Sequence, residues 1–257
     1  MPLNVPTRHN DKLRALVAAI DADEELAQWW KCANVNVVDR QGMTDHGEVH
    51  IRIVTNAALK LLRLLAEAGI QSSIESTYGM TADDAEVVVV AAAALHDIGI
   101  AVHRDDHEQF SVPIAVGLLP RLLEGLYTPA EQVIVQAETL HAIIAHSWET
   151  KCLTIEAGVV KVADALDITQ GRSRIPYEAG SASIHTISAA AIDQVRLLRG
   201  EETPIRIEIE MSNSAGVFQV DELLKRKLRN SSIAPYVQVV AQIEGETEKR
   251  LLEFYTM

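Results

Sequence analysis

The chain has 257 residues, of which 48% are hydrophobic but only 4% aromatic, so its core must be built from Ala, Val, Leu and Ile. The net charge of −13 argues against stable nucleic-acid binding, because no block of Lys and Arg offsets it. Cys32 and Cys152 are far apart, which is typical of a cytoplasmic protein without disulfides. The N-terminus lacks a signal-peptide pattern, and the longest apolar run, 87–95, is too short to span a membrane.

Helical periodicity dominates up to about residue 170 and predicts five or six helices. The first covers residues 10–30 and begins with Asn10 or Asp11 as its N-cap. The stretch 50–69 carries one apolar stripe and ends at Gly69, a natural stop signal. Three threonines are expected to cap later helices: Thr81 before an apolar helix at 85–97, Thr128 before one that runs to about His146, and Thr154 before one that runs through Asp164.

The pattern changes after this helical part. Residues 171–185 are rich in Gly and Ser and indicate a loop. Residues 204–211 alternate apolar and charged side chains, which predicts a half-buried strand; a short amphipathic helix at 220–230 and a second strand at 236–246 follow. We therefore expect a helical domain at 1–194 and a small α+β unit at 195–257. This unit is expected to pack on the helical core, with homodimerisation as the weaker alternative.

Residues that commonly bind metals are concentrated in the helical part. Seven of the nine histidines lie between residues 46 and 146. A buried Asp or His without a partner is costly, so a shared metal ion is one economical explanation. Imidazole and carboxylate together suit Zn, Mn, Fe, Co or Mg. A single helical histidine is more often structural, however, so none of these residues is specific alone.

One tempting motif is rejected. The segment His46-Gly-Glu-Val-His50 has the spacing of a zinc-peptidase helix, but that motif needs Glu directly after the first His. Here Gly47 occupies that position.

The order of the candidate ligands resembles the HD-domain superfamily of metal-dependent phosphohydrolases. The matching residues are His50 in "HIRIV", His96-Asp97 in "ALHDIG" and Asp164 in "VADALD". His107 and His146 match two further positions of the two-metal branch. The resemblance covers about residues 45–170 and implies an HD-type helical bundle; it does not cover the C-terminal unit.

This resemblance implies a metal centre with two divalent ions per chain. A carboxylate can bridge two cations, so Asp97 is the expected bridge. His50, His96 and Asp164 would complete one metal shell, and His107 with His146 would hold the second ion. A site with one ion, held by the first set alone, stays open as an alternative.

The implied reaction is cleavage of a small phosphomonoester or phosphodiester, a nucleotide being one candidate, by a metal-activated water. Asp97, His141 and Lys161 are the candidate catalytic residues. The candidate substrate-binding residues are Arg104, Lys161, Arg172 and Arg174, because an acidic protein needs local positive charge to bind phosphate. His103 and His141 could act beside the ligands or be structural.

Two other readings remain. Some HD proteins, such as myo-inositol oxygenase, hold two irons on the same kind of ligand set, so an oxygenase acting on a polyol or phosphonate is the alternative enzyme. A non-catalytic signalling module is less favoured, because every matched ligand position is kept.

Overall fold

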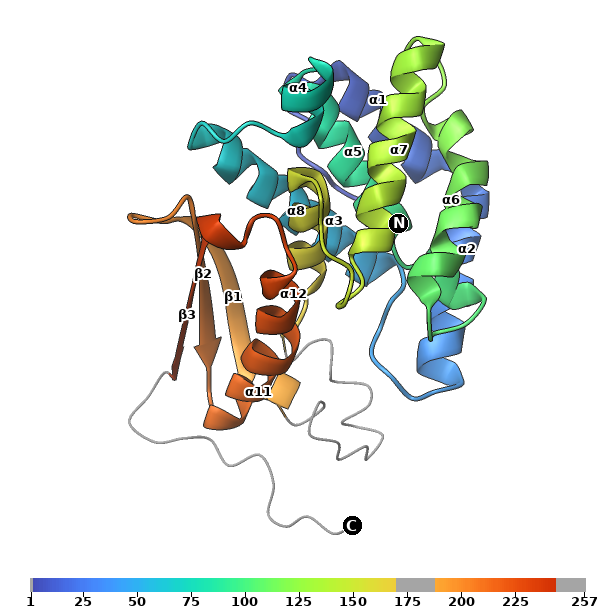
Figure 1. The fold of residues 1–257 in the computed structure, drawn as a ribbon. Helices are drawn as coiled ribbons and strands as arrows, with labels where there is room; N and C mark the ends of the chain where they lie inside the picture. The colour runs from blue at the N-terminus through green and yellow to red at the C-terminus, as the bar shows by residue number, and fades with distance from the viewer. Residues whose placement is uncertain (1, 170–187, 244–257) are drawn as a thin grey trace.

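The computed structural model describes residues 2–169 and 188–243, and the fold below is that of these residues. Within residues 11–164 it contains eight α-helices, where five or six were expected. They are α1 (Asp11–Ala22), α2 (Glu24–Asn34), α3 (Glu48–Glu67), α4 (Ser73–Tyr78), α5 (Ala82–Leu95), α6 (His107–Leu122), α7 (Pro129–Ala145) and α8 (Ile155–Asp164). Figure 1 shows them as a bundle with a small sheet at one side, which confirms the mainly α fold class.

The predicted helix starts are confirmed by hydrogen bonds. Asn10 caps α1 by accepting from the backbone N–H of Leu13. Thr81 and Thr128 each take part in a capping box, with Asp84 and Glu131 respectively. Thr154 caps α8. These caps satisfy N–H groups that the first helical turn leaves without intrahelical partners.

Two helix boundaries differ from the prediction. The first predicted helix is split at Asp23, which ends α1 and whose side chain caps α2 by accepting from the N–H of Leu26. The apolar helix expected at 85–97 begins at Ala82 and ends at Leu95. His96 is its C-cap, and Asp97 lies beyond it with non-helical backbone angles (φ −102°, ψ 1°). The doublet therefore sits on the turn that leaves the helix, rather than on the helix itself.

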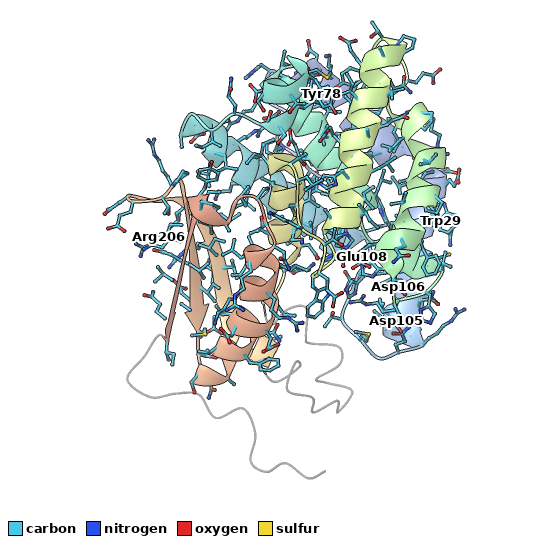
Figure 2. The ribbon with its side chains drawn as sticks, viewed as in Figure 1. Trp29, Tyr78, Asp105, Asp106, Glu108 and Arg206 are labelled. Atoms are coloured by element: carbon cyan, nitrogen blue, oxygen red, sulfur yellow. The ribbon has the colours of Figure 1, made fainter. Side chains whose placement is uncertain are left out.

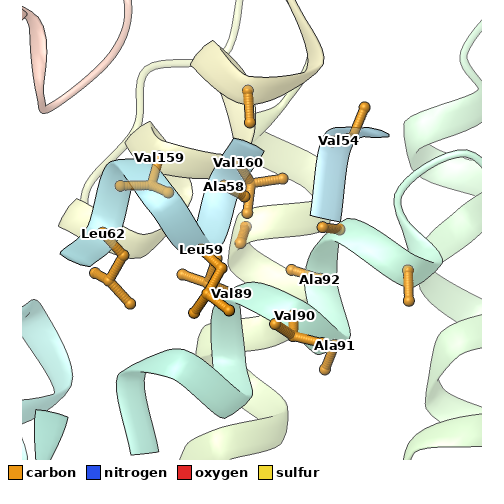
Figure 3. Packing of buried hydrophobic residues seen from close by; sticks show 14 of the residues in the cluster. Val54, Ala58, Leu59, Leu62, Val89, Val90, Ala91, Ala92, Val159 and Val160 are labelled. Carbon is orange, nitrogen blue, oxygen red and sulfur yellow. The ribbon is translucent and has the colours of Figure 1, made fainter. Parts of the chain in front are cut away.

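Helix α5 is the centre of the core. Every residue from Val87 to Leu95 is fully buried, so the helix is apolar on all sides and must be surrounded. Figure 3 shows its residues 89–92 packed against Val54, Ala58, Leu59 and Leu62 of α3 and Val159 and Val160 of α8. Because the His96-Asp97 doublet follows directly after Leu95, the last residue of this central helix, it lies in the middle of the bundle.

The C-terminal unit contains a three-stranded sheet in the order β1-β2-β3. Strand β1 (Ile192–Arg199) was not predicted and begins before the expected boundary at 195. It pairs antiparallel with β2 (Ile205–Met211), which pairs parallel with β3 (Val237–Ile243). These last two confirm the predicted strands. The division into two domains stays a prediction.

The parallel pair is connected by helical segments, as a parallel connection requires. The predicted helix at 220–230 forms as a π-helical stretch, Val220–Leu224, followed by α12 (Lys225–Arg229); the short α11 (Val217–Gln219) precedes them. Helix α12 packs against α8 of the bundle. The predicted loop at 171–185 lies outside the described residues. Over the part of the chain that is described, no helix has both the length and the apolar character that a bilayer span demands.

Candidate metal centre

Asp97 lies at the middle of the candidate site. Its side chain is almost fully buried, and its Oδ2 atom has no hydrogen-bond partner among the described residues. A buried carboxylate oxygen without a partner is costly in a folded protein. This observation calls for a positively charged ligand at Oδ2.

The first group of potential ligands surrounds Oδ2 of Asp97. The Nε2 atoms of His50, from α3, and His96 lie 3.3 Å and 3.4 Å from this oxygen. Oδ1 of Asp164, the last residue of α8, lies 3.3 Å from Nε2 of His50 and 3.6 Å from Nε2 of His96. The predicted first ligand set is therefore brought together from three helices that pack on one another.

The second group surrounds the other oxygen, Oδ1 of Asp97. Nε2 of His107, the first residue of α6, lies 3.1 Å from it, and Nε2 of His146, just after α7, lies 3.5 Å away. The two Nε2 atoms are 3.2 Å apart. Asp97 thus presents one oxygen to each group, as a bridging carboxylate would.

Hydrogen bonds at Nδ1 orient the four imidazoles. His50 donates from Nδ1 to Oδ2 of Asp167 at 2.7 Å, and His96 and His146 donate to the carbonyls of Ala93 and Ile143 at 2.8 Å and 2.6 Å. For His107, both the carbonyl and Nη1 of Arg104 lie 3.0 Å from Nδ1. In the neutral rings of His50, His96 and His146, the proton on Nδ1 leaves the Nε2 lone pair on the side of Asp97.

These facing lone pairs fit a bound cation. Nε2 of His50 and Nε2 of His96 are 3.4 Å apart, and two lone pairs at such a distance repel unless a cation or a proton lies between them. Two ligands on one ion, each bonded at about 2.1 Å, are separated by roughly 3.0–3.4 Å. The distances within both groups are close to that range, so the residues present fit divalent metals.

The electrostatics favour ionised carboxylates on Asp97 and Asp164 and a neutral imidazole on His146. Burial by itself raises the pKa of Asp97, but the adjacent imidazoles, His96 foremost, more than offset this and hold the pKa well below its usual range. The pKa of Asp164 is likewise held well below its usual range, because Lys227, His50 and His96 outweigh the effect of burial. Burial lowers the pKa of His146 to about 4. Divalent metals bind carboxylates in their ionised form and imidazoles in their neutral form.

Asp167 is a residue that the sequence analysis missed. It is buried, and its carboxylate accepts the hydrogen bond that orients His50. We expect Asp167→Asn to weaken Mn²⁺ binding by about 10- to 100-fold, as loss of such a supporting carboxylate typically does. Calorimetric titration of the metal-free protein with Mn²⁺ measures this.

Asp45→Asn is the matched control for Asp167. Asp45 accepts from the backbone N–H of His50 at 3.1 Å, rather than from its ring, so its amide variant should keep the wild-type affinity for Mn²⁺. Equal affinities for Asp167→Asn and the wild type would contradict the orienting role.

Gly99 allows α6 to approach the doublet closely. A Cβ atom at this position would lie 2.1 Å from the carbonyl oxygen of His107 and 2.4 Å from the backbone nitrogen of Ser111. The Ser111 hydroxyl also accepts from the N–H of Gly99 and donates to the carbonyl of His96. Gly99 and Ser111 thus fasten the turn that bears Asp97 to the helix that bears His107.

Gly99→Ala is expected to destabilise the fold by about 1–3 kcal/mol, since the clash is with backbone that cannot rotate away. Gly117→Ala lies within helix α6 with open space around it and should instead stabilise by up to about 1 kcal/mol through helix propensity. Urea unfolding of both variants measures the contrast, and similar stabilities for the two would show that the close approach is unimportant.

Not all of the predicted catalytic and substrate-binding residues lie beside the predicted metal ligands. Arg104 is beside the second group: its Nη1 lies 3.0 Å from Nδ1 of His107, and its buried Nε has no hydrogen-bond partner among the described residues. Asp105, Asp106 and Glu108 surround the same end of α6 in Figure 2, and Oε2 of Glu108 lies 3.5 Å from Nδ1 of His107.

Lys161 and His141 are not brought to the ligand atoms. Lys161 is fully buried and donates to the carbonyl of Thr150, and burial lowers its pKa. His141 accepts at Nε2 from the N–H of Leu153 at 3.1 Å, and burial lowers its pKa as well. His103 is exposed and accepts from the N–H of Asp105. Arg172 and Arg174 lie outside the described residues.

The fold and the site together define a helical protein with a buried cluster of His and Asp side chains suited to divalent metals. Residues 49–169 match the HD domain family, and all six predicted ligands lie within them. An uncharacterized protein of Methanocaldococcus jannaschii is 42% identical over 224 residues, which cover 87% of this chain and 86% of the relative. No solved structure matches significantly. The chain belongs to the HD-domain superfamily, a superfamily of metal-dependent hydrolases that bind divalent metals.

Proposed function

We propose that this protein is a phosphohydrolase with two divalent metal ions, which cleaves a small phosphomonoester or phosphodiester such as a nucleotide. The observation that carries the proposal is that the two carboxylate oxygens of Asp97 face two different pairs of histidines. Oδ2 faces Nε2 of His50 and His96, and Oδ1 faces Nε2 of His107 and His146. A single ion would need only one of these groups.

The residues of the chain would act mainly by holding and orienting. The six ligands would fix two ions beside each other, and Asp167 would keep His50 in the orientation that exposes Nε2. Bound divalent ions supply Lewis acidity and lower the pKa of a coordinated water. Arg104, beside His107, would place a guanidinium near an anionic substrate. We keep Arg172 and Arg174 as further candidates for this role.

The partners follow from the same proposal. The substrate is a small phosphorylated molecule, and the charge of −13 gives no reason to expect a nucleic-acid or membrane partner. A signalling module without catalysis is disfavoured, because the chain keeps all six matched ligand positions in groups that could hold metal ions.

The test begins with metal content. Untagged protein reconstituted with Mn²⁺ is expected to hold two ions per chain by mass spectrometry and to hydrolyse p-nitrophenyl phosphate, its bis-ester or members of a nucleotide panel. Two irons in the purified protein, with oxygen uptake on a polyol or phosphonate, would instead favour the oxygenase. No bound metal after reconstitution would refute the metal centre.

Metal removal should also lower the thermal stability. An ion present at 100 times its dissociation constant stabilises the folded state by about 2.7 kcal/mol, which corresponds to roughly 5–10 °C in a chain of this size. We expect EDTA to lower the midpoint by that amount and Mn²⁺ to restore it, as scanning calorimetry measures. An unchanged midpoint would mean that the cluster binds no metal in the folded state.

A further inference from the structure

The C-terminal unit is fastened to the segment that follows the ligand His146. The side chain of Asn230, which follows α12, donates to the carbonyl of Trp148 at 2.7 Å, and its own carbonyl accepts from the N–H of Cys152 at 2.9 Å. The guanidinium of Arg226 lies 4.8 Å from the centre of the Trp148 ring, a cation–π contact. Helix α12 is therefore held against the loop between α7 and α8.

The turn after α12 is also fastened to α8, the helix that ends in Asp164. The hydroxyls of Ser231 and Ser232 donate to the carbonyls of Gly158 and Thr154 at 3.1 Å and 2.5 Å. A Cβ atom on Gly158 would lie 2.2 Å from Oγ of Ser232, so a larger residue there would displace this hydroxyl. The position of α12 relative to the metal centre is thus fixed from two sides.

This docking brings Lys227 to the centre. Its ammonium forms an ion pair with Oδ2 of Asp164, while Oδ1 of the same carboxylate faces His50 and His96. The Lys227 and Asp164 side chains keep 11% and 13% of their surface exposed, so the described residues do not enclose the pair completely. The ammonium of Lys227 has three N–H donors. Among the described residues, it donates to Asp164.

The charge balance argues that this lysine does more than support Asp164. With two divalent ions bound, Asp164 would have a metal ion as its counter-charge and would no longer need Lys227 for compensation. The Lys227 ammonium would then be able to pair with an anionic ligand. Arg104 lies beside the second group and Lys227 beside the first, so each half of the centre has its own cation.

We propose that Lys227, supplied by the C-terminal unit, binds the phosphoryl group of the substrate, so that this unit completes the active site. The inference rests on the proposed phosphohydrolase function. It gives the C-terminal unit, for which the HD-domain match offers no role, a part in substrate binding.

The test separates phosphate binding from support of Asp164. Lys227→Gln removes the charge but keeps an amide that can donate to Asp164. The Mn²⁺-loaded full chain is titrated with inorganic phosphate by calorimetry, and its Mn²⁺ content is measured by mass spectrometry. We expect two Mn²⁺ per chain to be retained and phosphate to bind roughly 10- to 100-fold more weakly, with most affinity restored in Lys227→Arg.

Lys225→Gln is the control, because Lys225 lies on the same helix but pairs with the exposed Asp221. It should bind phosphate as the wild type does. Wild-type phosphate affinity in Lys227→Gln would overturn the inference, and so would loss of Mn²⁺ together with phosphate, which would make Lys227 a positioning residue for Asp164. If Lys227→Gln does not fold, Lys227→Met is measured in the same way. A wild-type protein that holds no Mn²⁺ would instead refute the proposed function itself.

Discussion

Asp97→Asn is expected to reduce the bound Mn²⁺ from two ions to less than one and to lower kcat/KM by more than about 100-fold. The variant has nearly the same shape, but its amide offers one oxygen and one NH₂ group where the carboxylate offers two oxygens. Because each oxygen of Asp97 faces a different group of imidazoles, both proposed ions would lose a ligand at once. Loss of a residue that only supports a ligand already costs about 10- to 100-fold, so the ligand itself should cost more.

The control for Asp97→Asn is Asp105→Asn, which makes the same chemical change at an exposed position on the segment that leads to α6. Mass spectrometry of the Mn²⁺ content and steady-state kinetics on p-nitrophenyl phosphate compare the two. Asp105→Asn should match the wild type in both. Full activity in Asp97→Asn would eliminate the metal centre as the site of reaction.

The features that the sequence predicted well are those that depend on neighbouring residues. A helix cap needs only a side chain and an N–H group three residues later, so Thr81 and Thr128 could be recognised from their local pattern. The stop at Gly69 is of the same kind, and the residue has the positive φ of 80° that glycine tolerates. The split at Asp23 was missed because the acidic residues around it are also compatible with a continuous helix.

The features that the sequence did not reveal depend on distant residues. Asp167 is 117 residues from its partner His50, and Lys227 is 63 residues from Asp164. No local pattern specifies either pair, since both arise from how α3, α8 and α12 pack together. Strand β1 was missed for another reason: its exposed and buried residues do not alternate strictly, so the period of two that marks a strand is absent. The six predicted ligands, by contrast, were chosen from their order through the family resemblance, and the structure brings their side chains together.

The number of metal ions is decided most directly by His107. His107→Ala removes one Nε2 from the second group but touches no atom of the first, where His50, His96 and Asp164 surround the other oxygen of Asp97. We therefore expect this variant to hold one Mn²⁺ per chain where the wild type holds two. Hydrolysis should fall by more than about 100-fold, since the remaining ion lacks its neighbour.

The matched control is His103→Ala, because His103 lies four residues before His107 but is exposed and interacts with the backbone of Asp105. It should hold two Mn²⁺ and keep its activity. Mass spectrometry of both variants distinguishes the possible centres. One ion in His107→Ala and two in the wild type supports two separate shells that share Asp97. One ion in both proteins, with equal activity, would show that the first group is the whole site and that His107 and His146 only pack against it.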